Sequence, residues 1–343
     1  MSTANLCTRR KFLETAIAAV PVVAAVACGS TIDAGPDGGG VESGADGADA
    51  GLDAAAEGAA VDAAPEVHCS ASFPRLELKA DCGAVGDGKT NDTAALQKAA
   101  ALIQKAGGGE LVIPEGVYIV GKQTVKSSAN APGPWYQAAA LFTVTGLACL
   151  KVSGYGATIR VQSGLHYGGF NPSTGQPQDY TGGSANEAAV GRIFNIQSSQ
   201  NVYIEGLELD GSNESLVLGG QVGNVDRQVA ATGIVFNECA DVTVVDVHTH
   251  HHALDGIAVE HLSGPPPKKM PHKLVRVVSE YNGRQGLSWI GGWGLECIDC
   301  KFNHTGRAMN GGAPMMSKPR AGLDIEPNAG TAQMTRDGLV TRC

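Results

Sequence analysis

The chain has 343 residues, of which 43% are hydrophobic, 17% charged and only 5% aromatic, and its formal net charge is −9. That charge is unevenly placed, because residues 29–68 contain nine acidic residues and no lysine or arginine. Residues 69–343 therefore carry a net charge of only −2, and nothing in this balance indicates a nucleic-acid partner.

Residues 1–28 resemble a twin-arginine export signal. Arg9 and Arg10 precede an apolar stretch over residues 16–27, which is shorter than the about 20 apolar residues of a membrane span. We expect this segment to be cleaved after export. Residues 25–28 resemble a lipoprotein box, in which Cys28 becomes the lipidated first residue, although they also satisfy an Ala-x-Ala signal-peptidase site.

Residues 29–68 consist almost entirely of alanine, glycine and acidic residues. Such a composition offers too little apolar surface to offset conformational entropy, so we predict a disordered linker. The sequence thus predicts an exported lipoprotein that is anchored to a membrane, in the periplasm or at the cell surface. Its folded domain is expected to span residues 69–343.

Seven cysteines remain after Cys7 and Cys28 are set aside. An exported protein permits disulfides, and the spacing makes Cys69 and Cys82 a plausible local pair. Cys297 and Cys300 have the spacing of a redox or metal motif. They lie in a strand-like run, however, where residues three apart should face opposite ways, and no second cysteine pair lies nearby.

An amphipathic helix is predicted near residue 93, with Asn91 or Asp92 as its N-cap and Gly107 as its end. The surrounding run, residues 78–120, closely resembles the opening of the rhamnogalacturonase- and epimerase-like pectate lyase domains, which are related to family 28 glycoside hydrolases. In that family the run caps the open end of a parallel β-helix. The resemblance implies that Asp87 and Asp92 are turn and cap residues rather than catalysts.

The chain repeats itself from about residue 140 onward. Four segments begin at Gly233, Gly256, Gly286 and Gly322, with spacings of 23, 30 and 36 residues. Alternation along a strand places one set of side chains inward and another outward. The predicted inward set is Ile234/Phe236, Ile257/Val259, Leu287/Trp289 and Leu323/Ile325, and the outward set is Val235/Asn237, Ala258/Glu260, Ser288/Ile290 and Asp324/Glu326.

A second repeat lies out of phase with the first. It aligns Val202–Asp210, Val242–His250, Leu274–Asn282 and Leu295–Asn303 without gaps. Stacked coils of this kind bury a core that no single coil could form. We therefore predict an all-β domain, a right-handed parallel β-helix of the pectin-lyase kind, with an N-terminal capping helix. The last residues resemble the start of another strand, so a truncated C-terminal end is expected.

The outward column offers acidic groups for catalysis. Asp324 and Glu326 are two residues apart on one strand, so their Cβ atoms should lie about 6.5–7 Å apart. Their carboxyls could then span either the retaining or the inverting separation of a glycosidase. Glu260 is expected two coils away. Such a cluster should raise one pKa and so provide a general acid.

Other candidates lie beside this column. Asp255 precedes a marker glycine close to the histidine run 248–252, in which His250 is a candidate proton carrier; the run lacks a firm third ligand, so no metal site is predicted. Arg284 and Arg320 precede marker glycines and could bind a uronate carboxylate. Aromatic residues of the 131–190 insertion could stack on sugars: Trp135, Tyr136 and Tyr167.

The resemblance implies a carbohydrate-active enzyme, a hydrolase, lyase or epimerase whose partner is a polysaccharide, in particular an acidic one. The catalytic motifs of family 28 are absent, and so is the cluster of aspartates that holds Ca²⁺ in pectate lyases. Ca²⁺ is the one cofactor that the resemblance leaves open. The alternative function is a non-catalytic, glycan-binding or adhesin-like surface lipoprotein.

Overall fold

The computed structural model describes residues 69–126, 134–179, 186–220, 229–327 and 334–343. The predicted signal segment, Cys28 and the predicted linker all lie outside these described residues. Within them, no helix is both long enough and apolar enough to cross a membrane.

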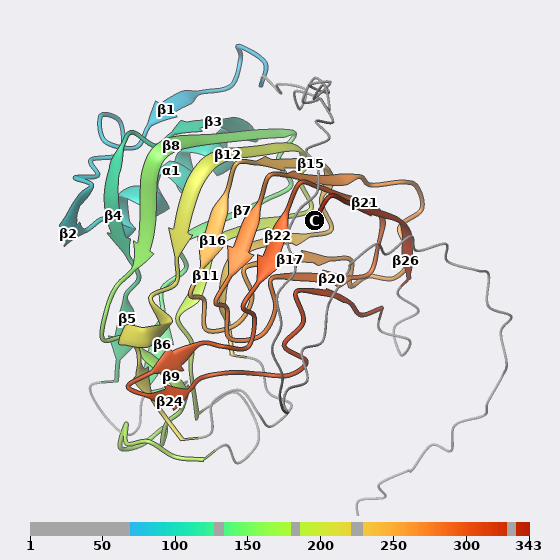
Figure 1. Ribbon diagram of the computed structural model, residues 1–343. Helices are drawn as coiled ribbons and strands as arrows, with labels where there is room; N and C mark the ends of the chain where they lie inside the picture. The colour runs from blue at the N-terminus through green and yellow to red at the C-terminus, as the bar shows by residue number, and fades with distance from the viewer. Residues whose placement is uncertain (1–68, 127–133, 180–185, 221–228, 328–333) are drawn as a thin grey trace, which may run out of the picture. The chain divides into compact units, whose positions relative to one another are not determined.

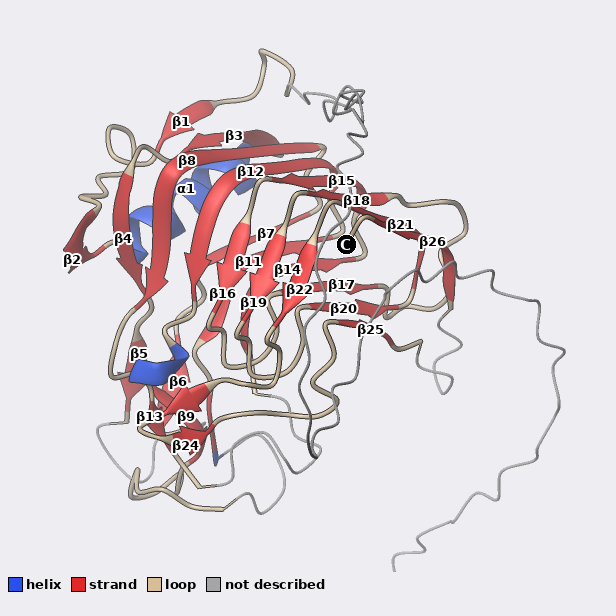
Figure 2. Cartoon of the chain, viewed as in Figure 1, coloured by secondary structure: helices blue, strands red, loops and turns tan. Residues whose placement is uncertain are grey.

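One wall of the domain is a parallel sheet to which each coil adds one strand (Figure 2). The register follows the marker glycines, since Ile234 pairs with Ile257, Ile257 with Leu287 and Leu287 with Leu323. Its six strands are β7 (Phe142–Thr145), β11 (Gly191–Gln197), β14 (Ala231–Asn237), β17 (Ile257–Glu260), β20 (Leu287–Ile290) and β25 (Leu323–Ile325).

A second, 13-stranded sheet forms the other two walls, because its long strands β8 and β12 bend through a corner (Figure 1). The first half of β8 pairs with β3 and its second half with β4, while β12 pairs in the same way with β15 and β16. The strands are β1 (Arg75–Glu77), β2 (Asp87–Asn91), β3 (Gly108–Val112), β4 (Gly116–Val120), β8 (Cys149–Val161), β12 (Gln200–Asp210), β15 (Ala240–Val245), β16 (His248–His250), β18 (His272–Val275), β19 (Val278–Glu280), β21 (Gly292–Ile298), β22 (Lys301–Asn303) and β26 (Thr335–Thr341).

Short elements decorate the connections between the walls. They are β5 (Gln123–Val125) with β6 (Tyr136–Ala138), β9 (His166–Gly169) with β10 (Glu187–Ala188) and β13 (Val217–Leu218), β23 (Met309–Asn310) with β24 (Ala313–Pro314), and the 3₁₀ turn Asn213–Ser215. Figure 1 shows β5, β6, β9 and β24 gathered below the long bent strands.

The domain is a parallel β-helix, as predicted. The inward column is confirmed, because Ile234, Phe236 and Trp289 and their predicted companions lie in one continuous hydrophobic core, with Leu323 packed against it. Ile325 is the exception and is 51% exposed. It lies on β25, which has a neighbour on one side only among the described strands.

The second repeat is correct except for one segment. Val242 pairs with His272, and His272 with Leu295, while His250 pairs with Glu280, and Glu280 with Asn303. The third segment is therefore His272–Glu280, two residues earlier than the predicted Leu274–Asn282. A shift of two residues keeps every side chain on its face, so alternation alone could not detect it.

Non-glycine residues in the left-handed conformation form columns where the coils turn. In one column Asp246, Arg276, Asp299 and Arg342 all have φ between 51° and 55°. Arg276 binds Asp246 at 2.6 and 2.8 Å, and Arg342 binds Asp299 at 2.6 and 2.9 Å. Ion pairs between successive coils thus accompany a conformation that is costly for residues other than glycine.

These turns explain why Cys297 and Cys300 do not face opposite ways, as their spacing on a strand had predicted. Both thiols face the core and are at most 1% exposed. The left-handed residue Asp299 between them turns the chain, so that residues three apart point the same way. Burial raises the pKa of both thiols, that of Cys300 to about 12, which makes them poor nucleophiles.

The helix α1 (Thr93–Ala106) covers the first coil and packs on β3 and β7. It begins after Asp92 and ends at Gly107, whose φ of 75° suits a glycine, as predicted. Asp92 accepts hydrogen bonds from the backbone of Val85 and Gly86 at 2.8 and 3.0 Å. Asp87 similarly accepts the backbone N–H groups of Lys89 and Thr90, so it is a turn residue as predicted. Asp92 is structural as well, but its side chain binds the preceding loop and makes no cap hydrogen bond to α1.

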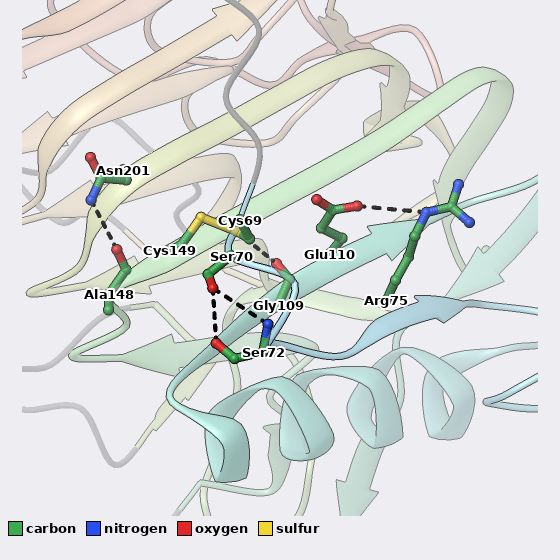
Figure 3. The surroundings of a disulfide bond; sticks show 9 residues. All are labelled: Cys69, Ser70, Ser72, Arg75, Gly109, Glu110, Ala148, Cys149 and Asn201. Carbon is green, nitrogen blue, oxygen red and sulfur yellow. Dashed lines mark hydrogen bonds and ion pairs between the residues drawn. A yellow bond between two sulfur atoms is a disulfide. The ribbon is translucent and has the colours of Figure 1, made fainter.

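The disulfide in this region differs from the prediction. Cys69 is bonded to Cys149 at the start of β8, and Cys82 is a buried free thiol (Figure 3). Residues that are distant in sequence but adjacent in neighbouring coils can lie within disulfide range. Here Gly108 pairs with Cys149, and the sulfur of Cys69 lies 3.6 Å from the carbonyl oxygen of Gly109. Local spacing could not reveal this register.

Candidate functional site

Asp255 and Arg284 form an ion pair buried at the ends of the connections that lead into β17 and β20. Arg284 donates from Nε and Nη2 to the two carboxylate oxygens of Asp255 at 2.7 and 2.6 Å, and both side chains are 2% exposed. Burial raises the pKa of Asp255 to about 6, against the opposing effect of Arg284. This pair is out of reach of a polysaccharide, so the structure gives it a structural position.

Asp324 and Glu326 lie beside that pair on the last strand of the wall. Gln285 Nε2 donates to Asp324, while Ser288 Oγ donates to Glu326 Oε1 at 2.9 Å. The pKa of Asp324 is raised by burial and by the neighbouring Glu326, to which its carboxyl is hydrogen-bonded. The raised pKa agrees with expectation.

Several residues of the predicted outward column are buried in this wall. Val235, Ala258 and Ser288 point outward in the register but are at most 2% exposed. Glu260, two strands from Glu326 as predicted, accepts a hydrogen bond from Asn237 at 3.1 Å. A covered face offers a sugar chain little room.

The predicted binding residues are dispersed over different elements. Arg320 is exposed in the connection before β25, with φ of 69°. Tyr136 is stacked on His166, with ring centroids 3.6 Å apart, and Trp135 precedes it in a partly exposed position. Tyr167 is 2% exposed and donates to the carbonyl of Val229 at 3.2 Å, so its ring cannot stack on a sugar.

His250 belongs to a different wall, where we find a second polar group of residues. This histidine–carboxylate cluster comprises Glu208 and Asp210 of β12, His248 and His250 of β16, and Glu280 of β19. The register places Glu208 beside His248, and Asp210 beside His250, which in turn lies beside Glu280. His250 Nε2 lies 3.1 Å from Glu208 Oε1, and His248 Nε2 lies 3.1 Å from Glu280 Oε1.

Further contacts orient these groups. Thr158 Oγ1 donates to Glu208 Oε2 at 2.6 Å, and Arg160 Nε donates to Asp210 Oδ2 at 2.7 Å. His250 Nδ1 lies 2.7 Å from His251 Nδ1. Because one nitrogen of that last pair must accept, the two rings cannot both be fully protonated.

Glu208 and Asp210 favour their charged forms. Burial raises the pKa of Glu208, but hydrogen bonds from Thr158 and His250 outweigh it and lower the pKa overall. The pKa of Asp210 is likewise lowered, because its bonds to Ser212 and Arg160 outweigh burial. Burial lowers the pKa of His250, and the carboxylates offset this only in part. The cluster therefore places ionised carboxylates against neutral imidazole.

A hollow of about 300 Å³ opens beside the cluster. Three successive coils line this hollow. They contribute residues 156–158 of β8, residues 206–208 of β12, and Asp246 with His248. The side chains of Glu208 and His248 are 41% and 42% exposed, whereas His250 is 11% exposed. Two cluster members are thus open to solvent, with His250 behind them.

No protein-family model matches this chain, and no curated protein matches its sequence. Solved structures do match it at low similarity. Bacteriophage phi29 gene product 12 is 17% identical with a TM-score of 0.40, over 66% of this chain and 25% of that one. The mannuronan C-5 epimerase AlgE6 A-module of Azotobacter vinelandii is 18% identical with a TM-score of 0.35, over 65% and 55%.

The surface adhesin PfbA of Streptococcus pneumoniae is similar at the same level, with 14% identity, a TM-score of 0.33, and coverage of 70% of this chain and 62% of that one. In all three cases the chain spans less than two thirds of the matched protein. Similarities this low do not assign an activity. The fold is established by the strand register of the chain itself.

The sequence missed most of the histidine–carboxylate cluster. Only His250 was proposed, while Glu208 and Asp210 were read as part of a strand repeat. A signal was nevertheless present, because the alignment of Val202–Asp210 with Val242–His250 already placed Glu208 beside His248 and Asp210 beside His250. Reading that repeat for chemistry as well as for fold would have found the cluster.

Proposed function

We propose that this protein is a polysaccharide-processing enzyme whose active site is the histidine–carboxylate cluster. The observation that carries the proposal is the Glu208–His250 pair beside an open hollow. An anionic carboxylate next to an imidazole can accept and return a proton within one site, as hydrolases, lyases and epimerases all require. The hollow leaves room for a sugar unit at the exposed edge of Glu208.

This proposal moves the site away from Asp324 and Glu326. The outward residues beside that pair, Ala258 and Ser288, are buried, whereas the cluster borders a hollow and has its acid and base groups oriented by contacts with neighbouring strands. Rigid strands position catalytic groups more precisely than loops do. The alternation of β12 and β16 holds four of the five cluster residues on one face.

A panel of neutral and acidic polysaccharides tests the proposal, with new reducing ends and unsaturated products as the two readouts. We expect turnover of at least one polymer by the full chain, and its loss by 10²-fold or more in Glu208→Gln. Glu326→Gln is the matched control and should retain turnover. Activity that survives Glu208→Gln but not Glu326→Gln would return the site to the six-stranded wall.

One observation favours the alternative, a non-catalytic glycan-binding or adhesin-like protein. The charged cluster residues are hydrogen-bonded to one another or to neighbouring strands, which is also how a purely structural network would look. Retention on immobilised polysaccharide without turnover of any polymer would support this second function.

Export and membrane anchoring belong to the same proposal. A tethered enzyme would meet polymers outside the cytoplasm, where the Cys69–Cys149 disulfide is stable. Lipidation of Cys28 is tested by mass spectrometry of the chain purified from membranes. We expect a diacylated N-terminal cysteine in the wild type, and release of the protein from the membrane in Cys28→Ala.

A further inference from the structure

We propose that Glu208, His248 and His250 bind a divalent transition-metal ion of the zinc class. This inference names the cofactor of the proposed active site, and its functional meaning rests on that proposal. One ligand atom from each residue lies within 4.8 Å of the other two. In a tetrahedral zinc site the ligand atoms lie about 3.3 Å apart, given bonds of about 2.0–2.1 Å, so small rotamer changes suffice.

The backbone already arranges these ligands. His248 and His250 are two residues apart on β16 and share a face, with ring centroids 4.4 Å apart. Glu208 lies on the adjacent strand β12, directly beside His248 in the parallel register. The three ligands therefore lie on two hydrogen-bonded strands, and no change of the backbone is needed to bring them together. The histidine run lacked a third ligand in the sequence, and the neighbouring coil supplies it.

The donor set selects the class of metal. Two imidazoles and one carboxylate suit Zn²⁺ and its neighbours, and zinc sites of this composition keep a further position for water or substrate. Ca²⁺ and Mg²⁺ prefer oxygen ligands throughout, so the cluster disfavours them. The expected metal therefore differs from Ca²⁺, the one cofactor that the family resemblance had left open.

Contacts behind the ligands have the form expected of a metal site. Thr158 fixes one oxygen of Glu208, and the second nitrogen of His250 meets His251, with Asp210 Oδ1 at 3.9 Å. Such outer contacts hold the ring orientation and the tautomer of a ligating histidine. Binding at Nε2 would require the one proton of the neutral His250 ring to move to Nδ1, where His251 Nδ1 would accept its hydrogen bond, so the ring would stay neutral.

The charge of the site also favours a cation. Of the three carboxylates of the cluster, those of Glu208, Asp210 and Glu280, only Asp210 is paired with a guanidinium, that of Arg160, among the described residues. Without an ion this surface would repel an acidic sugar. A divalent ion next to the hollow would offset the excess and offer its open position to a uronate carboxylate.

Zn²⁺ and Co²⁺ titrations of the chelator-treated full chain test the site, by calorimetry and by the visible absorption of bound Co²⁺. We expect one ion per chain, and at least about tenfold weaker binding in Glu208→Gln and in His248→Gln. His304→Gln removes an imidazole of similar exposure outside the proposed ligand set and should bind as wild type. Cys343→Ser controls for the exposed thiol and should also bind unchanged.

Absence of binding by wild type with a native circular dichroism spectrum would overturn the proposal, and so would undiminished binding by both ligand variants. A loss confined to His251→Asn would move the ion to Asp210, His250 and His251, the other group with suitable spacing, and would also overturn it. Metal binding without turnover of any polysaccharide would support the metal site and contradict the proposed enzymatic function. Turnover that resists chelation, in a chain that binds no Zn²⁺ or Co²⁺, would do the reverse.

Discussion

Removal of Asp255 should destabilise this protein more than any loss of a surface charge. Asp255→Ala leaves the guanidinium of Arg284 buried, with only Ser288 Oγ at 3.4 Å and Glu326 Oε1 at 3.7 Å for compensation. Breaking a buried pair from one side costs about 3–5 kcal/mol. At roughly 2–4 °C per kcal/mol for a domain of this size, the melting temperature should fall by roughly 6–20 °C.

The partner variant should behave differently with pH. In Arg284→Met the Asp255 carboxyl loses its counter-charge, while burial already raises its pKa to about 6 in the wild type. A raised pKa means stability that is present at low pH and lost as pH rises through the folded-state pKa. Arg284→Met should therefore lose less stability near pH 5 than near pH 8. Asp255→Ala removes the titrating carboxyl itself, so its loss should be larger near pH 5 than near pH 8, the opposite trend.

Urea unfolding measures these differences without the screening that guanidinium would add, and the buried Trp289 provides a fluorescence signal. Asp246→Ala is the matched control. It removes a two-point pair of similar length to Arg276, but those side chains are 33% and 37% exposed, so the expected cost is at most about 1 kcal/mol. Equal costs for Asp255→Ala and Asp246→Ala would refute the reasoning.

Reduction of the Cys69–Cys149 disulfide, which closes a loop of 80 residues, should lower the unfolding free energy by at most about 4.5 kcal/mol, as measured by urea unfolding with and without reductant. An unchanged midpoint would show that the first coil unfolds independently. His272, between Val242 and Leu295 in the core register, has its pKa lowered to about 3 by burial. Its stabilising contribution is therefore present above pH 6.5 and lost as pH falls toward 3, so His272→Leu should gain roughly 2 kcal/mol over wild type between pH 7.5 and pH 5. Parallel pH profiles of the two melting temperatures would contradict this.

The fold could be predicted because its signal repeats. Alternating apolar residues follow Gly233, Gly256, Gly286 and Gly322 in four coils. A wrong strand assignment in one coil therefore does not change the predicted fold. The error of two residues in the predicted segment that began at Leu274 could not be detected in this way, because a shift of two residues preserves the alternation. The disulfide and the orientation of Cys297 and Cys300 each depend on a single turn. The sequence repeat carries no information about a feature that occurs once.

The site was harder to predict because its members come from different coils. Asp324 and Glu326 were proposed because they are acids close together in sequence. Neighbouring residues of the outward column, such as Ala258 and Ser288, are buried, and the alternation of side chains could not predict that. His250 and Glu208 are 42 residues apart and meet only through the register of β12 and β16. In a solenoid a site is assembled across the coils, so β16 read along the chain shows His248 and His250 but not their partner Glu208.

The corner that shapes the fold also shapes the hollow. β8 and β12 bend through Gly156 and Gly206, whose φ values of 79° and 70° favour glycine, and both residues line the hollow. A side chain at Gly206 would meet the ring of Tyr155 at 2.5 Å, so the corner is filled on one side and left empty on the other. Glu208 follows Gly206 by two residues. Its carboxylate is therefore delivered to the edge of the hollow by the same bend that starts the second wall, which couples the geometry of the proposed site to the closure of the coil.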